Sequence, residues 1–106
     1  MEVMESVTAE VVRAARQTLE VRRILLFGSR AAGTAAADSD HDFLIVADSD
    51  LSPNDRIDLV RSRLLHVREP LDIFVVTPEE FERLRSWTST VIHEASVTGK
   101  VVYEAA

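Results

Sequence analysis

Three aspartates have the spacing of a site that binds a hard metal ion. Asp40 and Asp42 lie two residues apart at the start of the apolar run Phe43–Val46, and side chains two apart on a strand point to the same face. Asp72 lies near the start of another apolar run, Leu71–Val76. If these runs are neighbouring strands, three carboxylates converge. Such a cluster is typical of a Mg²⁺ site, because Mg²⁺ prefers oxygen ligands and keeps positions open for water and substrate phosphates.

Other motifs with similar spacing do not fit. The run from Asp38 to Asp42 resembles the opening of an EF-hand calcium loop, but Phe43 and Ser49 stand where that loop needs glycine and glutamate. Gly28 and Gly33 have the spacing of a P-loop, but the lysine that this motif requires is missing after Gly33. A dinucleotide-binding fingerprint needs a G-x-G sequence, which is absent.

A plain polar turn is the alternative for residues 38–40, because Asp and Ser are frequent in turns between strands. The position of Asp72 favours a site instead. An aspartate inside the apolar run Leu71–Val76 is costly unless it is paired or binds a ligand.

Composition restricts the class of protein. With 106 residues, 46% hydrophobic and 28% charged, the chain is expected to form one globular domain over residues 1–106. No apolar run is long enough to span a membrane, and we expect a cytoplasmic protein without a signal peptide. The absence of cysteine excludes disulfides and thiolate metal sites. A net charge of −6 argues against direct binding of nucleic acid, but not against a small phosphorylated ligand that binds with divalent cations.

The elements that must position the aspartates alternate between helices and strands. Ser52-Pro53 and the capping box Thr77-Pro78-Glu79-Glu80 are start signals of helices. The expected helices cover residues 1–21, 52–69, 77–87 and 90–98, with a short helix or turn within 30–37, and the expected strands cover residues 24–27, 43–46, 71–76 and 101–103. In the third of these helices, Phe81, Leu84 and Trp87 are expected on the inner face. This order predicts an α/β or α+β layer in which helices cover a sheet.

Gly28-Ser29, ten further residues, then Asp40-x-Asp42 resembles the G-S-x(10)-D-x-D signature of the polymerase-β-like nucleotidyltransferases. The length of the chain is similar to that of the minimal nucleotidyltransferases (MNT), the antitoxins of HEPN/MNT toxin–antitoxin modules. Three further segments resemble the family's third-carboxylate strand, the helix start after it and its closing strand: Leu71–Val76, Thr77–Phe81 and Gly99–Glu104.

The resemblance implies a role for each motif residue. Asp40 and Asp42 would hold two Mg²⁺ ions, and Asp72 would complete the catalytic one and help to activate the attacking hydroxyl. Gly28 would let the backbone approach the triphosphate of ATP, and Ser29 would bind that triphosphate through its hydroxyl and N–H.

The resemblance also implies a fold, a reaction and a partner. The fold is a mixed, mostly four-stranded sheet with helices packed mainly on one face. The reaction is Mg²⁺-dependent transfer of AMP from ATP, with a tyrosine hydroxyl of a cognate HEPN ribonuclease toxin as the acceptor. No membrane contact is expected, and both a homo-oligomer and a hetero-oligomer with the toxin remain open.

The sequence departs from the family pattern near the phosphates. Family members often carry further arginines where this chain has Ala31-Ala32 and Ala35–Ala37, so only Arg30 remains to meet phosphate charge. His41 replaces the apolar residue that is usual between the two aspartates, and as a strand neighbour it is expected to point away from them.

Two alternatives to protein adenylylation remain open. One is an antitoxin with little or no catalysis, which neutralises its HEPN partner by binding alone, and the missing arginines leave room for it. The other is nucleotide transfer to a small molecule, although relatives of that kind usually carry a further substrate-binding domain. The three intact aspartates favour an enzyme.

Overall fold

A computed structural model describes residues 6–34 and 39–106 of the chain. Four strands form one sheet in the order β3-β2-β1-β4. The strands are β1 (Glu20–Phe27), β2 (His41–Asp48), β3 (Leu71–Val76) and β4 (Lys100–Glu104). β2 and β3 are parallel, whereas β1 is antiparallel to both β2 and β4. The mixed four-stranded sheet predicted from the sequence is confirmed.

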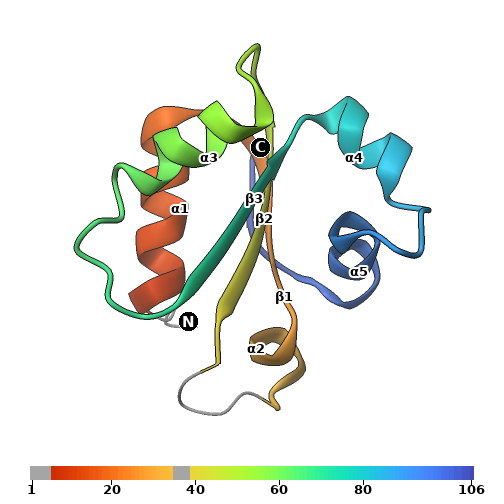
Figure 1. Ribbon diagram of the computed structural model, residues 1–106, viewed down its shortest axis with the longest axis horizontal. Helices are drawn as coiled ribbons and strands as arrows, with labels where there is room; N and C mark the ends of the chain where they lie inside the picture. Colours follow the sequence, from red (N-terminus) through yellow and green to blue (C-terminus); the bar gives the residue numbers. More distant parts are fainter. Residues whose placement is uncertain (1–5, 35–38) are drawn as a thin grey trace.

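Helices cover both faces of this sheet (Figure 1). The helices are α1 (Ser6–Thr18), α2 (Ser29–Ala32), α3 (Pro53–Arg61), α4 (Pro78–Leu84) and α5 (Val91–Thr98). α1 and α3 lie on one face, and α4 and α5 lie on the other. Within the described ranges, no helix combines the length and apolar character needed to cross a bilayer.

The expectation that the helices pack mainly on one face is therefore wrong in detail, and the reason lies in the strands. Phe43 and Ile45 of β2 are buried under α1 and α3, while Leu44 and Val46 are buried on the side of α4 and α5. Because the strand is apolar on both sides, each face has to be covered.

The helix start signals are confirmed. Thr77 and Glu80 form the reciprocal capping box at the start of α4, and Ser52 accepts a hydrogen bond from the backbone N–H of Asp55 at the start of α3. Thr90 caps α5 in the same way, by accepting from the N–H of His93. These local signals place the helices that follow β2 and β3.

Several helix ends differ from the prediction. The first helix ends at Thr18, and β1 begins at Glu20, because its first half pairs with the end of β2 as a partly exposed antiparallel strand. α3 ends at Arg61, well before Pro70. α4 ends at Leu84, so Trp87 lies beyond the helix and is 58% exposed rather than in the core. The predicted helix start at residues 1–5, and residues 35–38 with Asp38, lie outside the described residues.

Candidate functional site

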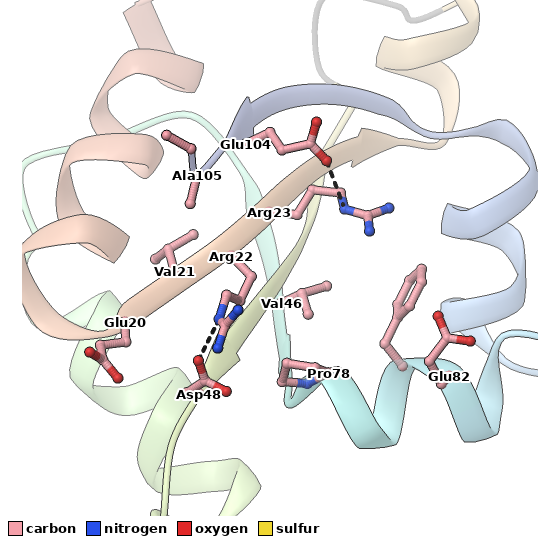
Figure 2. Close-up of a pocket in the computed structure, with 12 residues that line it drawn as sticks. Glu20, Val21, Arg22, Arg23, Val46, Asp48, Pro78, Glu82, Glu104 and Ala105 are labelled. Atoms are coloured by element: carbon pink, nitrogen blue, oxygen red, sulfur yellow. Dashed lines mark hydrogen bonds and ion pairs between the residues drawn. The ribbon is translucent and has the colours of Figure 1, made fainter.

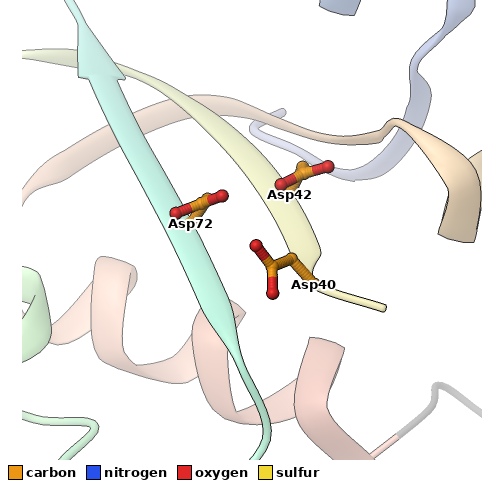
Figure 3. A group of neighbouring side chains, drawn as sticks. All are labelled: Asp40, Asp42 and Asp72. Atoms are coloured by element: carbon orange, nitrogen blue, oxygen red, sulfur yellow. The ribbon is translucent and has the colours of Figure 1, made fainter. Parts of the chain in front are cut away.

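The three predicted aspartates meet at one end of the sheet. Asp42 of β2 and Asp72 of β3 are direct partners in the parallel register, and Asp40 precedes β2 on the same side of the strand. One carboxylate oxygen from each residue lies within 4.8 Å of the other two. Figure 3 shows the three side chains directed toward one another from two adjacent strands. The convergence expected from neighbouring strands is thus confirmed, and we call these residues the aspartate triad.

The environment of Asp42 disfavours its negative charge. Partial burial and the nearby carboxylate of Asp72 raise the pKa of Asp42 to about 6, with smaller contributions from Asp40 and Glu94. Carboxylates held this close repel one another, and a cation between them relieves the repulsion. A divalent cation with oxygen ligands therefore fits the donor set of the triad.

Gly28 adjoins the triad through a close backbone approach. Asp42 pairs with Phe27 in the antiparallel register of β1 and β2, which brings the next residue, Gly28, beside the Asp42 carboxylate. A Cβ atom on Gly28 would lie 2.3 Å from Oδ2 of Asp42, and its φ is +73°. The backbone conformation at this position favours glycine, and a larger residue would displace the Asp42 carboxylate.

The other two predicted nucleotide-binding residues follow Gly28 directly. Ser29 is half-buried and opens the short helix α2. Arg30 is also half-buried, and its Nη2 donates a 3.0 Å hydrogen bond to the carbonyl of Ser39, just before β2. Arg30 thus joins the segment after β1 to the segment that carries Asp40. Its contact with phosphate stays a prediction.

His41 points away from the triad, as expected from strand alternation. It is 2% exposed, and its ring is stacked on Phe43 with 6.5 Å between the ring centroids. Phe43 belongs to the core under α1 and α3. His41 therefore packs against the opposite side of the sheet from Asp40 and Asp42.

Glu94 is a neighbour of the triad that the sequence analysis missed. It lies on α5 and is exposed, and its charge contributes to the raised pKa of Asp42. Glu94 follows Asp42 by more than fifty positions, and no motif joins the two residues. Only the packing of α5 beside β1 brings this fourth carboxylate toward the site.

A cavity of about 590 Å³ lies at the other end of the sheet, where β1 begins and β2 ends, and no triad residue lines it (Figure 2). Its arginines are already paired. Arg22 bonds Asp48 at 2.5 Å, and Arg23 lies 3.5 Å from Glu104. The three convergent carboxylates lie at the triad instead, so the triad is the candidate site.

Comparison with known proteins agrees with this geometry. Residues 10–106 match the sequence model of the family described as Polymerase beta, Nucleotidyltransferase. No curated protein is similar enough in sequence to count as a relative of the chain.

Solved structures share the fold at low identity. A chain of a toxin–antitoxin complex with AMP-PNP has a TM-score of 0.68 at 21% identity, over 92% of this chain and 73% of that chain. A chain from the complex of a tri-AMPylated Shewanella oneidensis HEPN toxin with an MNT antitoxin has a TM-score of 0.61 at 18% identity, over 92% of this chain and 70% of that chain.

Proposed function

Because the chain belongs to the polymerase beta nucleotidyltransferase family, we propose that it transfers AMP from ATP to a tyrosine hydroxyl of a HEPN toxin and so acts as an antitoxin. The observation that carries this proposal is the convergence of three carboxylates beside the Gly28-Ser29 turn. The partner is suggested by the likeness to chains of toxin–antitoxin complexes, one with AMP-PNP and one with a tri-AMPylated HEPN toxin.

The triad would hold the metal ions. Asp40 and Asp42 would bind two Mg²⁺ ions and Asp72 would share one of them, which fits the cluster of oxygen donors and the raised pKa of Asp42. Bound Mg²⁺ supplies the positive charge that stabilises the phosphate oxygens during transfer.

The chain's own residues would orient the two reactants. The open backbone at Gly28 and the hydroxyl and N–H of Ser29 would bind the triphosphate, next to Asp42. The acceptor hydroxyl would attack the α-phosphorus in line, so that an O–P bond forms as the bond to pyrophosphate breaks. Asp72 is exposed, and its carboxylate would take the proton of the attacking hydroxyl while pyrophosphate leaves with the bond electrons.

The direct test is incubation of the purified chain with Mg²⁺, ATP and a candidate HEPN-domain protein, to be sought first in the neighbouring reading frame. We expect the intact mass of the HEPN protein to increase by one or more AMP units, and its ribonuclease activity to fall in parallel. EDTA should prevent both changes. Neutralisation of the ribonuclease without any mass change would instead favour an antitoxin that acts by binding alone, and Arg30, already bonded to Ser39, makes this the second candidate.

Gly28→Ala is expected to reduce AMP transfer at least a hundredfold. The added Cβ would overlap Oδ2 of Asp42 at 2.3 Å, so either the backbone of the turn or the Asp42 carboxylate must move. Transfer rates at saturating ATP, together with thermal melts, measure the two consequences separately.

Gly33→Ala is the control for a substitution in the same turn without a clash. Gly33 has a φ of +76° and a ψ of 15°, in the left-handed region, and no atom lies within 4 Å of a Cβ placed there. The variant should lose about 1 kcal/mol of stability from backbone strain and keep most of its activity. Gly28 has a ψ of −157°, a conformation that only glycine adopts readily, so Gly28→Ala should lose more stability as well as activity. Equal losses of activity in both variants would mean that any disturbance of this turn, and not displacement of Asp42, explains the effect.

A further inference from the structure

The triad faces the side of the sheet that carries α4 and α5. Asp42 alternates with Phe43 and lies on the same face as Leu44, which packs in the core under these two helices. An acceptor hydroxyl must come within about 3–3.5 Å of the reacting phosphorus. The polypeptide that carries the hydroxyl must therefore lie on this face of the sheet, next to the triad.

Exposed apolar side chains are concentrated on the same side. Among residues 6–34 and 39–106, seven large hydrophobic residues are exposed, and four of them lie within positions 87–101: Trp87, Val91, Val97 and Val101. Val97 is 67% exposed although it lies within α5, in its last turn. An apolar helix face beside a reaction centre is typical of a surface that binds a protein.

Val91 and Val97 each lie three residues from Glu94 and so flank it on the exposed surface of α5, which we call the α5 face. These residues line a groove of about 440 Å³ together with Thr90 and Thr98. α5 packs beside β1, and its Ala95 lies in the same core cluster as Leu44, which shares a face of β2 with Asp42. The groove and the triad therefore lie on the same side of the sheet.

The α5 face is held in place before any partner binds. Thr90 caps the helix and donates its hydroxyl hydrogen to the carbonyl of Trp87. Nδ1 of His93 contacts the carbonyl of Arg85 at 2.7 Å, which fixes α5 against the end of α4. A surface ordered in this way loses little conformational entropy on binding.

We propose that the α5 face is the docking surface for the acceptor protein, an inference that rests on the transfer proposed above. The segment that binds is apolar, to cover Val91 and Val97, and carries basic residues, to meet Glu94. Its acceptor hydroxyl then lies beside the triad. Charge complementarity favours a basic segment because the exposed Glu94 lines the groove between Val91 and Val97, on a chain whose net charge is −6.

The test compares two α5-face variants with two controls on the opposite side of the sheet. The variants are Val91→Ser/Val97→Ser and Glu94→Lys. The controls are Leu65→Ser, which removes an apolar side chain that is 87% exposed, and Asp58→Lys in α3. For each protein we would measure the Kd for the HEPN-domain protein without nucleotide or metal, the KM for the same protein in transfer, and the shift in melting temperature caused by Mg-ATP.

We expect Kd and KM for the HEPN protein to rise more than tenfold in both α5-face variants and to stay within twofold in both controls. The shift in melting temperature caused by Mg-ATP should persist in both variants and both controls. The affinity of the wild type for the HEPN protein should fall with added salt. The affinity of Glu94→Lys should fall less, because this variant has lost one charge complementary to the partner.

Four outcomes would overturn the docking surface. The first is an unchanged Kd for the HEPN protein in the α5-face variants, and the second is an equal loss of affinity in the controls. The third is loss of the Mg-ATP melting shift in the α5-face variants, which would assign the face to nucleotide binding. The fourth is self-association of the wild-type chain that Val91→Ser/Val97→Ser abolishes. Binding of the HEPN protein without AMP transfer would overturn the proposed chemistry alone, because the Kd values still decide where the partner docks. No binding of the HEPN protein by the wild type would overturn both proposals.

Discussion

Asp42→Asn is expected to abolish AMP transfer while leaving the metal-free protein as stable as the wild type or more stable. The change removes one of the carboxylates that would hold Mg²⁺, but it also removes a negative charge that Asp72 and Asp40 repel. A catalytic group inside a like-charged cluster costs the free protein stability. Loss of function and gain of stability should therefore occur in the same variant.

The pH dependence of this effect follows from the pKa of Asp42, which is raised to about 6. In the unfolded chain the group titrates near its ordinary value of 3.8. Above pH 6, Asp42 is ionised in the folded protein, and this charge lowers the free energy of unfolding. The loss of stability disappears as the pH falls through 6 toward 3.8. The advantage of Asp42→Asn should be about 1 kcal/mol at pH 8, allowing for the partial exposure of the group, and should vanish near pH 4.

Thermal melts of both proteins in EDTA across this pH range, repeated with Mg-ATP, measure the prediction. Mg-ATP at a hundred times its Kd should stabilise the wild type by about 2.7 kcal/mol and the variant much less. Asp58→Asn, on the exposed side of α3, is the isosteric control and should change neither quantity. A variant that is clearly less stable in EDTA but has a normal Mg-ATP shift would make Asp42 a structural residue of the turn.

The predictable part of the fold was the part encoded by local patterns. The bounds of β3 were predicted to the residue because Leu71–Val76 is one apolar run after Pro70 and before the capping box of α4. The starts of α3 and α4 were predicted from their caps. The start of β1 at Glu20 was not, because Glu20 and Arg22 are exposed, and only their pairing with β2 makes them part of a strand.

In the candidate site, too, local patterns predicted some residues, and only tertiary packing could place the others. Asp40 and Asp42 were paired by strand alternation, and Asp72 joined them once β2 and β3 proved to be parallel neighbours. Glu94 approaches Asp42 only through the packing of α5, which no local pattern encodes. Trp87 was placed in the core by helical spacing, but α4 ends three residues before it.

Arg56→Ala is expected to have effects opposite to those of Asp42→Asn. The variant should lose much stability, but its folded molecules should transfer AMP at the normal rate. The guanidinium of Arg56 is buried, and it donates from Nη1 to Oε1 of Glu80 at 2.7 Å and from Nε to the carbonyl of Leu51 at 2.9 Å. The same Glu80 oxygen accepts the N–H of Thr77 in the capping box. One buried side chain thus joins α3 to the start of α4, at the end of β3 that lies away from Asp72.

Partial burial alone would raise the pKa of Glu80, but the hydrogen bond from Thr77 and the charge of Arg56 hold this pKa below its usual value. The pair therefore stabilises the fold at neutral pH, and its contribution is lost as the pH falls through the lowered pKa.

Removing Arg56 leaves the Glu80 carboxylate without its cation and leaves a cavity behind α3. We therefore expect urea melts at pH 7 to show that the free energy of unfolding falls by about 3 kcal/mol.

Arg85→Ala is the control, because the bond of Arg85 to Glu82 is exposed and should contribute less than about 1 kcal/mol to stability. The rate of AMP transfer per folded molecule should stay within twofold of the wild type in both variants, since the aspartate triad lies at the other end of the strands. A fall in that rate, with stability unchanged, would show that Arg56 acts on the site rather than on the fold. Together with Asp42→Asn, this variant would separate the residues that hold the sheet and helices together from those that this fold positions for chemistry.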